Sequence, residues 1–201
     1  MNRLLVVMDI GDVLIRTAPM AQWHDLGRRS GLPWREVAAA VETAGIVGAV
    51  ETGRVSAREF CAAIRAVLDR PELSDADIEQ AWNTVLLDVE PALAAVARRC
   101  ADSGMLLLAS NTSPIHWQKS KHLLAGAGVR APAVLSYEVG YAKPSANFFE
   151  VVAEADPRVP RSACYVDDRD DNVDAATASG MTGWLHSDPA VTAAFLCDLL
   201  S

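Results

Sequence analysis

The chain has 201 residues, of which 51% are hydrophobic, and this combination provides for one buried core with an insertion. Its 18 basic and 26 acidic residues give a formal net charge of -8, which disfavours a nucleic-acid partner. No apolar run is long enough for a membrane span or a signal core, so we expect a cytoplasmic protein without a membrane partner. We expect it to be a monomer or a homodimer.

A strongly apolar run at Leu4–Met8 predicts a buried strand, and two acids follow it closely. Asp9 and Asp12 flank the turn residues Ile10 and Gly11. An acid at the carboxyl end of a buried strand lies where open α/β sheets bind their ligands. We therefore expect Asp9 to belong to a functional site.

Residues 16–88 differ from the rest of the chain because they are rich in helical patterns and show no convincing strand. The predicted helices are Met20–Ser30, Trp34–Val47, Ser56–Leu68 and Asp75–Leu87. Ser56 followed by Glu59 predicts a capping box at the start of the third helix. We interpret residues 16–88 as a helical cap inserted into a core made of residues 1–15 and 89–201.

After the insertion, short apolar runs alternate with helical patterns. Apolar stripes predict helices over Pro91–Asp102 and Ala146–Glu154, and Ser113-Pro114 predicts the start of another helix. The further predicted strands are Met105–Ala109, Ala133–Ser136, Ala163–Val166 and Thr182–His186. This alternation indicates an α/β fold with a Rossmann-like parallel sheet that helices cover on both faces.

Three further positions after predicted strands carry residues that suit an anionic ligand. Asp167-Asp168 ends one strand, and together with Asp9 it provides carboxylates for one divalent cation. Ser110-Asn111-Thr112 follows another strand, with hydroxyl, amide and N–H groups for phosphate oxygens. Lys143, just before Pro144, supplies a positive charge for an anionic substrate. Each element alone is a weak signal, but their order along the chain indicates one site.

These residues resemble, in order, the four motifs of the haloacid dehalogenase (HAD) superfamily, and the resemblance covers essentially the whole chain. The matching segments are Asp9 to Val13, Ser110 to Thr112, Lys143-Pro144, and Asp167-Asp168 with Asn172. The insertion stands where subclass I members carry a helical cap. Residues 51–60 and Ala81-Trp82 are similar to cap segments of bacterial sugar-phosphate phosphatases and of the phosphatase-like domain of epoxide hydrolases.

The resemblance implies a Mg²⁺-dependent phosphatase that works through an aspartyl phosphate. Asp9 would attack phosphorus. Mg²⁺ would be held by the Asp9 carboxylate, the Gly11 backbone carbonyl and Asp168. The implied substrate is a small phosphorylated metabolite, and a sugar phosphate is one candidate.

The resemblance also implies roles for the remaining motif residues. Ser110, Asn111 and Lys143 would bind the phosphate group, and Ser110 and Lys143 would take part in catalysis by stabilising charge on the group being transferred. Asp167 and Asn172 would not contact the phosphate group directly but would support the residues that do. They would orient Lys143 or a metal-bound water.

Gly11 departs from the family pattern, in which a second aspartate two residues after the nucleophile protonates the leaving oxygen. Three explanations stay open: Asp12 supplies the proton, a solvent water supplies it, or the chain is a poor catalyst. Asp12 needs a helical or bulged turn to share the side on which Asp9 lies. Without a dedicated acid, the enzyme should prefer substrates with good leaving groups.

Specificity is expected to come from the cap, where the candidate residues are Trp23, His24, Arg28, Glu51 and Arg54. Two rival functions stay open. A hydrolytic 2-haloacid dehalogenase would use Asp9 on carbon, although that reaction needs no Mg²⁺ and gains nothing from clustered carboxylates. A catalytically weak scaffold with a binding or regulatory role would show no Mg²⁺-dependent turnover.

Overall fold

Five parallel strands form the central sheet of the computed structural model, which describes residues 4–159 and 161–200. Residues 1–3, 160 and 201, which the predicted core range includes, lie outside the described part. The strands, in the order in which they pair, are β5 Ala133–Leu135, β4 Leu106–Ser110, β1 Leu5–Met8, β6 Ala163–Asp167 and β7 Thr182–Leu185. The predicted α/β fold is confirmed. Each of the five predicted strands is present, with no end shifted by more than one residue.

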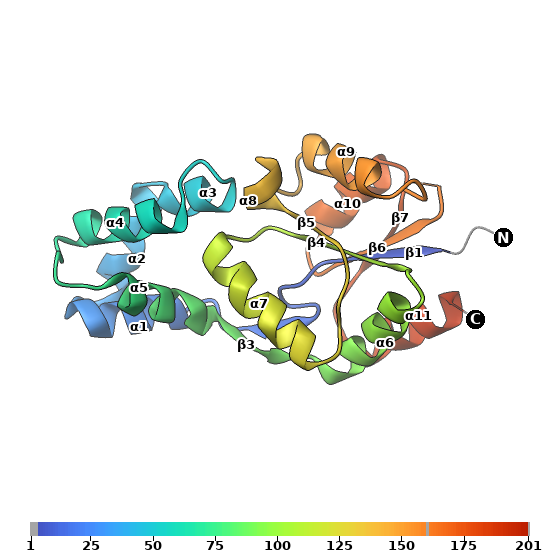
Figure 1. Cartoon of the computed structure of the whole chain (residues 1–201), viewed down its shortest axis with the longest axis horizontal. Coiled ribbons are helices and arrows are strands. Elements are labelled where there is room, and N and C mark those ends of the chain that lie inside the picture. Colours follow the sequence, from blue (N-terminus) through green and yellow to red (C-terminus); the bar gives the residue numbers. More distant parts are fainter. Residues whose placement is uncertain (1–3, 160, 201) are drawn as a thin grey trace.

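Helices cover both faces of this sheet, because alternate residues of a strand point to opposite sides. Val6 and Met8 of β1 belong to one core cluster with α6, α7 and α11, whereas Leu5 and Val7 belong to another with α9 and α10. These helices are α6 Pro91–Asp102, α7 Pro114–Gly126, α9 Ala146–Ala155, α10 Asp170–Ala178 and α11 Pro189–Leu199. Figure 1 shows α9 and α10 above the sheet and α6 and α11 below it.

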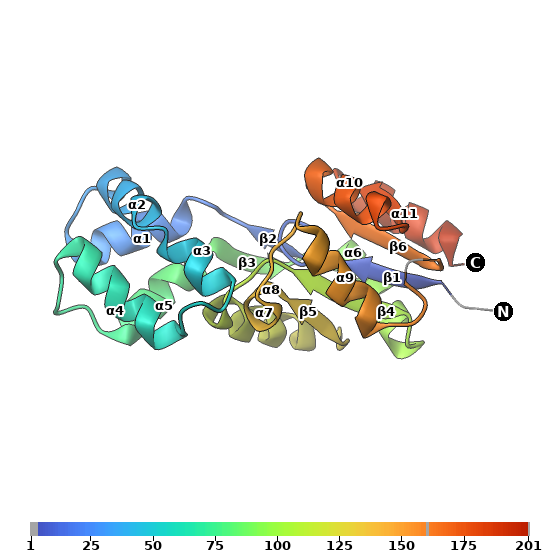
Figure 2. The ribbon, with the colours of Figure 1, turned by 90° about the horizontal axis from the view of Figure 1, so that it is seen from above.

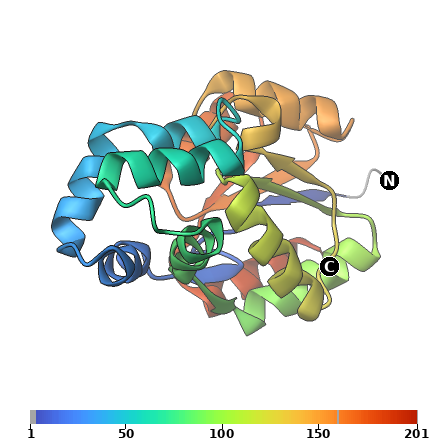
Figure 3. The ribbon, with the colours of Figure 1, turned by 60° about the vertical axis from the view of Figure 1, so that its left-hand side comes forward.

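A group of helices, the cap, lies at one end of the sheet (Figures 2 and 3). Its members are α1 Ala21–Ser30, α2 Trp34–Thr43, α3 Ile46–Glu51, α4 Ala57–Leu68 and α5 Asp75–Trp82. They pack around a core of their own, in which the Trp82 ring lies 5.4 Å from Trp23 and 4.8 Å from Phe60. The capping box expected at Ser56 and Glu59 is present at the start of α4. None of the described helices is both long and apolar enough to cross a bilayer.

Two predicted cap helices end earlier than the sequence indicated. The helix expected over Trp34–Val47 stops at Thr43, and Gly45, with a φ of 65°, separates it from α3. Glycine adopts this left-handed conformation at no steric cost, so the chain turns there. The helix expected over Asp75–Leu87 stops at Trp82.

The expectation that residues 16–88 contain no strand is wrong. The chain after α5 forms a short 3-10 turn, Asn83–Val85, and then strand β3, Leu86–Val89. This strand pairs antiparallel with β2, Ile15–Thr17, to form a two-stranded ribbon. A short apolar run fits a helix or a strand equally well, and the pairing partner lies far away in the sequence. Both predicted domain boundaries fall within this ribbon.

One of the contacts between the cap and the core is a close backbone contact at Gly53. Gly53, in the turn between α3 and α4, has a φ of 66° and lies against the carbonyl of Tyr137. Tyr137 belongs to α8, Ser136–Val139, the short helix that follows β5. A Cβ atom at position 53 would lie 2.1 Å from the Tyr137 oxygen, far inside contact distance. Glycine is therefore required here for the cap to rest on α8.

Gly53→Ala is expected to destabilise the protein more than Gly45→Ala does. Both positions have a left-handed φ, which costs a non-glycine residue roughly 1–2 kcal/mol, but nothing lies within 4 Å of a Cβ at position 45. The overlap with Tyr137 should add about 1–3 kcal/mol for Gly53→Ala alone. Equilibrium unfolding in urea measures both losses, and equal losses would contradict the close contact.

Candidate active site

The residues singled out at the strand ends gather at one edge of the sheet. Asp9 follows β1, Ser110 ends β4, Asp168 follows β6, and Lys143 lies in the loop between α8 and α9. They line a cavity of about 490 Å³ whose wall comprises Asp9, Gly11, Asp12, Ser110, Asn111, Lys143, Asp168, Arg169 and Asn172. The carboxyl ends of parallel strands meet at one edge, which is why the four segments converge.

The Lys143 ammonium group lies at the centre of this site. Its Nζ donates to Asp9 Oδ1 at 2.7 Å, to Asp167 Oδ2 at 2.7 Å and to the Ala109 carbonyl at 3.0 Å, which uses all three ammonium protons. All three charged side chains are buried. Burial alone would lower the pKa of Lys143, but the charges of Asp9 and Asp167 outweigh it and raise that pKa. Lys143 is therefore a fixed cation.

Hydrogen bonds occupy both carboxylate oxygens of Asp167. Oδ2 accepts from Lys143 and from the Tyr165 hydroxyl at 2.5 Å. Oδ1 accepts from Asn172 Nδ2 at 2.9 Å and from the backbone N–H of Arg169 at 3.0 Å. These four bonds match the four acceptor sites of a carboxylate. Asp167 thus holds Lys143 in place and has no acceptor site left for another ligand.

Neighbouring groups shift the pKa of the Asp9 carboxyl in opposite directions. Burial raises the pKa of its carboxyl, the Lys143 ammonium lowers it, and the Asp167 carboxylate raises it, with a net pKa of about 6. The Lys143 ammonium, which donates to Oδ1 at 2.7 Å, favours the carboxylate form, even though the exposed fraction of Asp9 is only 7%. A buried, ionised oxygen beside a fixed cation is suited to attack an electrophile in the cavity.

The acids of the site suit a divalent cation. One carboxylate oxygen from each of Asp9, Asp167 and Asp168 lies within 4.8 Å of the others. Hydrogen bonds use all the acceptor sites of Asp167, so Asp9 and Asp168 are the two acids of this cluster that are available to a cation. Gly11 lines the same cavity. Asn172 Oδ1 is buried and, within the described residues, lacks a hydrogen-bond partner, so a metal-bound water would satisfy it. Oxygen donors of this kind fit Mg²⁺.

Ser110 and Asn111 make different contacts. Within the described chain, the Ser110 hydroxyl has one hydrogen bond, a long one of 3.4 Å to the Asn111 carbonyl, so it is available to a ligand. The Asn111 side chain accepts from the Lys143 N–H at 2.7 Å and donates to the Lys143 carbonyl at 2.9 Å. This pair fixes the Lys143 loop against β4, a contact that the sequence did not indicate. The expected substrate contact of Asn111 stays a prediction.

Asp12 reaches the cavity wall, but Thr17 holds its side chain. Its φ of 51° provides the special turn that Asp12 needs to share a cavity with Asp9. One oxygen accepts from the Thr17 N–H at 3.0 Å, and the Thr17 hydroxyl lies 2.9 and 2.7 Å from the two oxygens. Asp12 therefore acts as an acceptor in this structure.

A smaller cavity of about 220 Å³ adjoins the first, and residues of the cap form part of its wall. It shares Gly11, Ser110 and Asn111 with the larger cavity. The cap contributes Gln22 of α1, Val47 and Glu51 of α3, and Trp82 of α5. This mixture of apolar and polar walls is typical of a pocket for the organic part of a small ligand.

Of the five cap candidates, Glu51 is the one that lines either cavity within the described chain. Trp23 is buried in the core of the cap. The other three, His24, Arg28 and Arg54, contact neighbouring residues of the cap.

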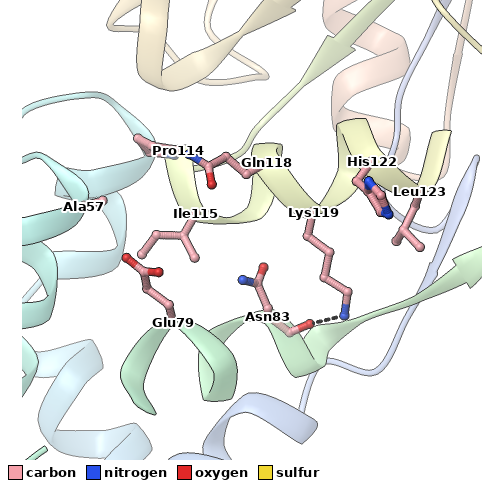
Figure 4. A pocket seen from close by; sticks show the side chains of 9 residues that line it. All are labelled: Ala57, Glu79, Asn83, Pro114, Ile115, Gln118, Lys119, His122 and Leu123. Atoms are coloured by element: carbon pink, nitrogen blue, oxygen red, sulfur yellow. Dashed lines mark hydrogen bonds between the residues drawn. The ribbon is translucent and has the colours of Figure 1, made fainter. Parts of the chain in front are cut away.

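Helix α7 of the core holds the end of the last cap helix. Lys119 Nζ donates to the carbonyls of Asn83 at 2.7 Å and Leu86 at 2.6 Å, and Figure 4 draws the first of these bonds. His116 Nε2 donates to the Trp82 carbonyl at 3.0 Å, and its ring stacks on Trp82. Carbonyls at a helix end need partners outside the helix, and α7 supplies them. Sequence reasoning missed this anchor, because it joins residues that are distant in the chain.

A third cavity, of about 390 Å³, lies between α7 and the cap helices α4 and α5 (Figure 4). Glu79 is the single acid on its wall, and none of the strand-end residues contributes to it. We therefore assign the candidate active site to the first two cavities.

Comparison with solved structures gives the class of fold. A HAD family enzyme, bt-2542 from Bacteroides thetaiotaomicron, matches with a TM-score of 0.84 and 24% identity over 93% of this chain and 95% of that one. A predicted HAD-like family hydrolase from Porphyromonas gingivalis matches with a TM-score of 0.78 and 20% identity, over 96% and 98%. The L-2-haloacid dehalogenase from Xanthobacter autotrophicus has a TM-score of 0.60 and 16% identity, over 94% and 81%. No protein-family model matches the chain. The fold is the HAD fold, as the motifs led us to expect.

His116 is expected to make the protein less stable in acid. Burial lowers its pKa from 6.5 to about 4, against the opposing effect of the bond to the Trp82 carbonyl. Between these values the unfolded chain binds a proton at His116 that the folded chain does not bind. The free energy of unfolding is therefore unaffected by His116 above pH 6.5 and decreases as the pH falls towards 4. His116→Gln keeps a donor for Trp82 and should remove up to about 1.4 kcal/mol per pH unit of this slope.

Urea unfolding at a series of pH values measures the slope. His122→Gln is the control, because His122 is exposed on the same helix. If the two variants show the same pH dependence, the account based on a buried, neutral histidine is wrong.

Proposed function

We propose that the protein is a Mg²⁺-dependent phosphoric monoester hydrolase that acts on a small phosphorylated metabolite through an aspartyl phosphate. The observation that carries the proposal is the buried Lys143 ammonium, which bridges Asp9 and Asp167 at 2.7 Å each, with Asp168 in the same cluster. A preorganised positive charge beside a carboxylate nucleophile suits the transfer of an anionic group.

Asp9 is the proposed nucleophile. One of its oxygens attacks phosphorus, the bond to the alcohol oxygen breaks, and the phosphoryl group remains on Asp9. Water then attacks that phosphorus and releases inorganic phosphate. Lys143 offsets the charge of the transferring group, and the Ser110 hydroxyl donates to a phosphate oxygen. Asp167 keeps Lys143 aligned through both steps.

We propose Mg²⁺ as the cofactor, with Asp9, the Gly11 carbonyl and Asp168 as its protein ligands. Bound there, the ion neutralises charge that otherwise repels a phosphate ester from two carboxylates. Support comes from the bt-2542 enzyme, which was crystallised in complex with magnesium and inorganic phosphate and matches this chain with a TM-score of 0.82 at 23% identity.

Hydrolysis at carbon is the alternative, because the L-2-haloacid dehalogenase has the same fold. The presence of Asp168 favours attack on phosphorus over attack on carbon. Displacement of halide from carbon requires no metal ion, and a further acid beside the nucleophile would only add repulsion to a site that binds a carboxylate substrate.

Phosphate release from a panel of phosphorylated metabolites is expected to require both Mg²⁺ and Asp9. Asp9→Asn should lower kcat by more than about 10³-fold, because the nucleophile is lost. Asp168→Asn should raise the Mg²⁺ concentration needed for half-maximal activity. A colorimetric phosphate assay, with and without a chelator, measures these effects.

Asp170→Asn is the matched control, since Asp170 is an exposed acid near the site that does not line the cavity. Its activity should equal that of the unchanged protein. Chelator-resistant release of halide from a 2-haloacid would support the dehalogenase instead. Absence of turnover across the whole panel would support a scaffold with a binding role.

A further inference from the structure

The proposed hydrolysis lacks an evident proton donor for the departing alcohol. Gly11, two residues after Asp9, has no side chain, and Thr17 engages both oxygens of Asp12. An alkoxide leaves slowly near neutral pH unless an acid protonates it while its bond to phosphorus breaks. The donor must therefore come from another element of the site or from solvent.

The smaller cavity contains one acid. Glu51 is the single carboxyl group on its wall, which also includes Gly11 and Ser110 of the phosphate-binding side. Val47 and Trp82 make part of the same wall apolar. An ester whose phosphate lies between Asp9 and Ser110 would extend its organic part into this space. In that arrangement the Glu51 carboxyl group and the organic part of the ester share the smaller cavity.

The cap fixes the position of Glu51 relative to the core. Glu51 is the last residue of α3, two residues before Gly53, which rests on the Tyr137 carbonyl. The contact that seats the cap therefore also positions the carboxyl group. A loop without such a contact would not hold a donor close to a reacting oxygen.

The surroundings of Glu51 suit a proton donor. Within the described chain its carboxyl makes no hydrogen bond or ion pair, and burial raises its pKa. The other titratable group on this wall, His116, is engaged with the Trp82 carbonyl, and burial lowers its pKa, so it is neutral. Gln22, whose Oε1 is buried without a partner among the described residues, is an amide and has no acidic proton.

We propose that Glu51 protonates the leaving oxygen and so performs the task for which Gly11 has no side chain. This inference rests on the proposed function. An Asp9 oxygen bonds to phosphorus while the bond between phosphorus and the alcohol oxygen breaks. The electron pair of that bond stays on the alcohol oxygen, which takes the Glu51 proton, and the neutral alcohol leaves. The Glu51 carboxylate then takes a proton from the water that attacks phosphorus, which restores the acid and frees Asp9. The balance is ester plus water to alcohol plus phosphate.

Leaving groups of different basicity test this role. 4-Nitrophenyl phosphate releases a stabilised phenolate that needs no proton, whereas glycerol phosphate releases an alkoxide that does. With Mg²⁺ present, Glu51→Gln is expected to lower kcat/KM for glycerol phosphate by about 10²-fold, and for 4-nitrophenyl phosphate by no more than about threefold. Glu51→Asp, which keeps the carboxyl group, should recover part of the loss.

Glu79→Gln is the control, because it makes the same chemical change in the cap at the third cavity. It should leave both rates unchanged. Equal losses on the two esters in Glu51→Gln would overturn the inference, and so would no loss on either, which would assign the proton to water. A selective loss in Asp12→Asn with none in Glu51→Gln would overturn it in favour of Asp12. If the unchanged protein hydrolyses neither ester nor any member of the metabolite panel, the proposed function fails, and the inference fails with it.

Discussion

The site depends on three charges that are buried together: the Lys143 ammonium and the carboxylates of Asp9 and Asp167. Removing one member of such a group leaves an uncompensated charge away from water, which typically costs about 3–5 kcal/mol. The topology places Asp9 and Asp167 at the carboxyl ends of adjacent strands, since β1 pairs with β6. The Asn111 side chain on the other side of β1 ties the Lys143 loop to β4. Stability and reactivity are therefore set by the same few atoms.

The cap is held to this core at separate places with different chemistry. The β2–β3 ribbon carries the chain into and out of the cap, while α7 supplies donors to the carbonyls of Trp82, Asn83 and Leu86. Gly53 adds a contact on α8 that excludes any side chain. Together these contacts define the smaller cavity, whose walls come from both parts of the chain.

The sequence predicted the features that local pattern determines. Strands β1, β4 and β6 are mostly apolar and lead into Asp9, Ser110 and Asp167-Asp168, so their limits and the convergence of these polar residues could be inferred. The β2–β3 ribbon was not predicted, because Leu86–Val89 has a pattern that also fits the end of a helix. Only the pairing with β2, which is distant in the sequence, makes this segment a strand. Likewise, no spacing rule shows that the Asn111 amide binds the Lys143 backbone, because that pairing exists only after the two loops fold together.

The short helix α8 adds a constraint on chain length. It offers the Tyr137 carbonyl to Gly53 and then leads directly into the loop that ends at Lys143. Surface loops normally accept insertions and deletions with little effect. Between positions 137 and 143, however, one added or missing residue would displace either the support of the cap or the ammonium group at Asp9. This stretch is therefore fixed in length even though much of it is exposed to solvent.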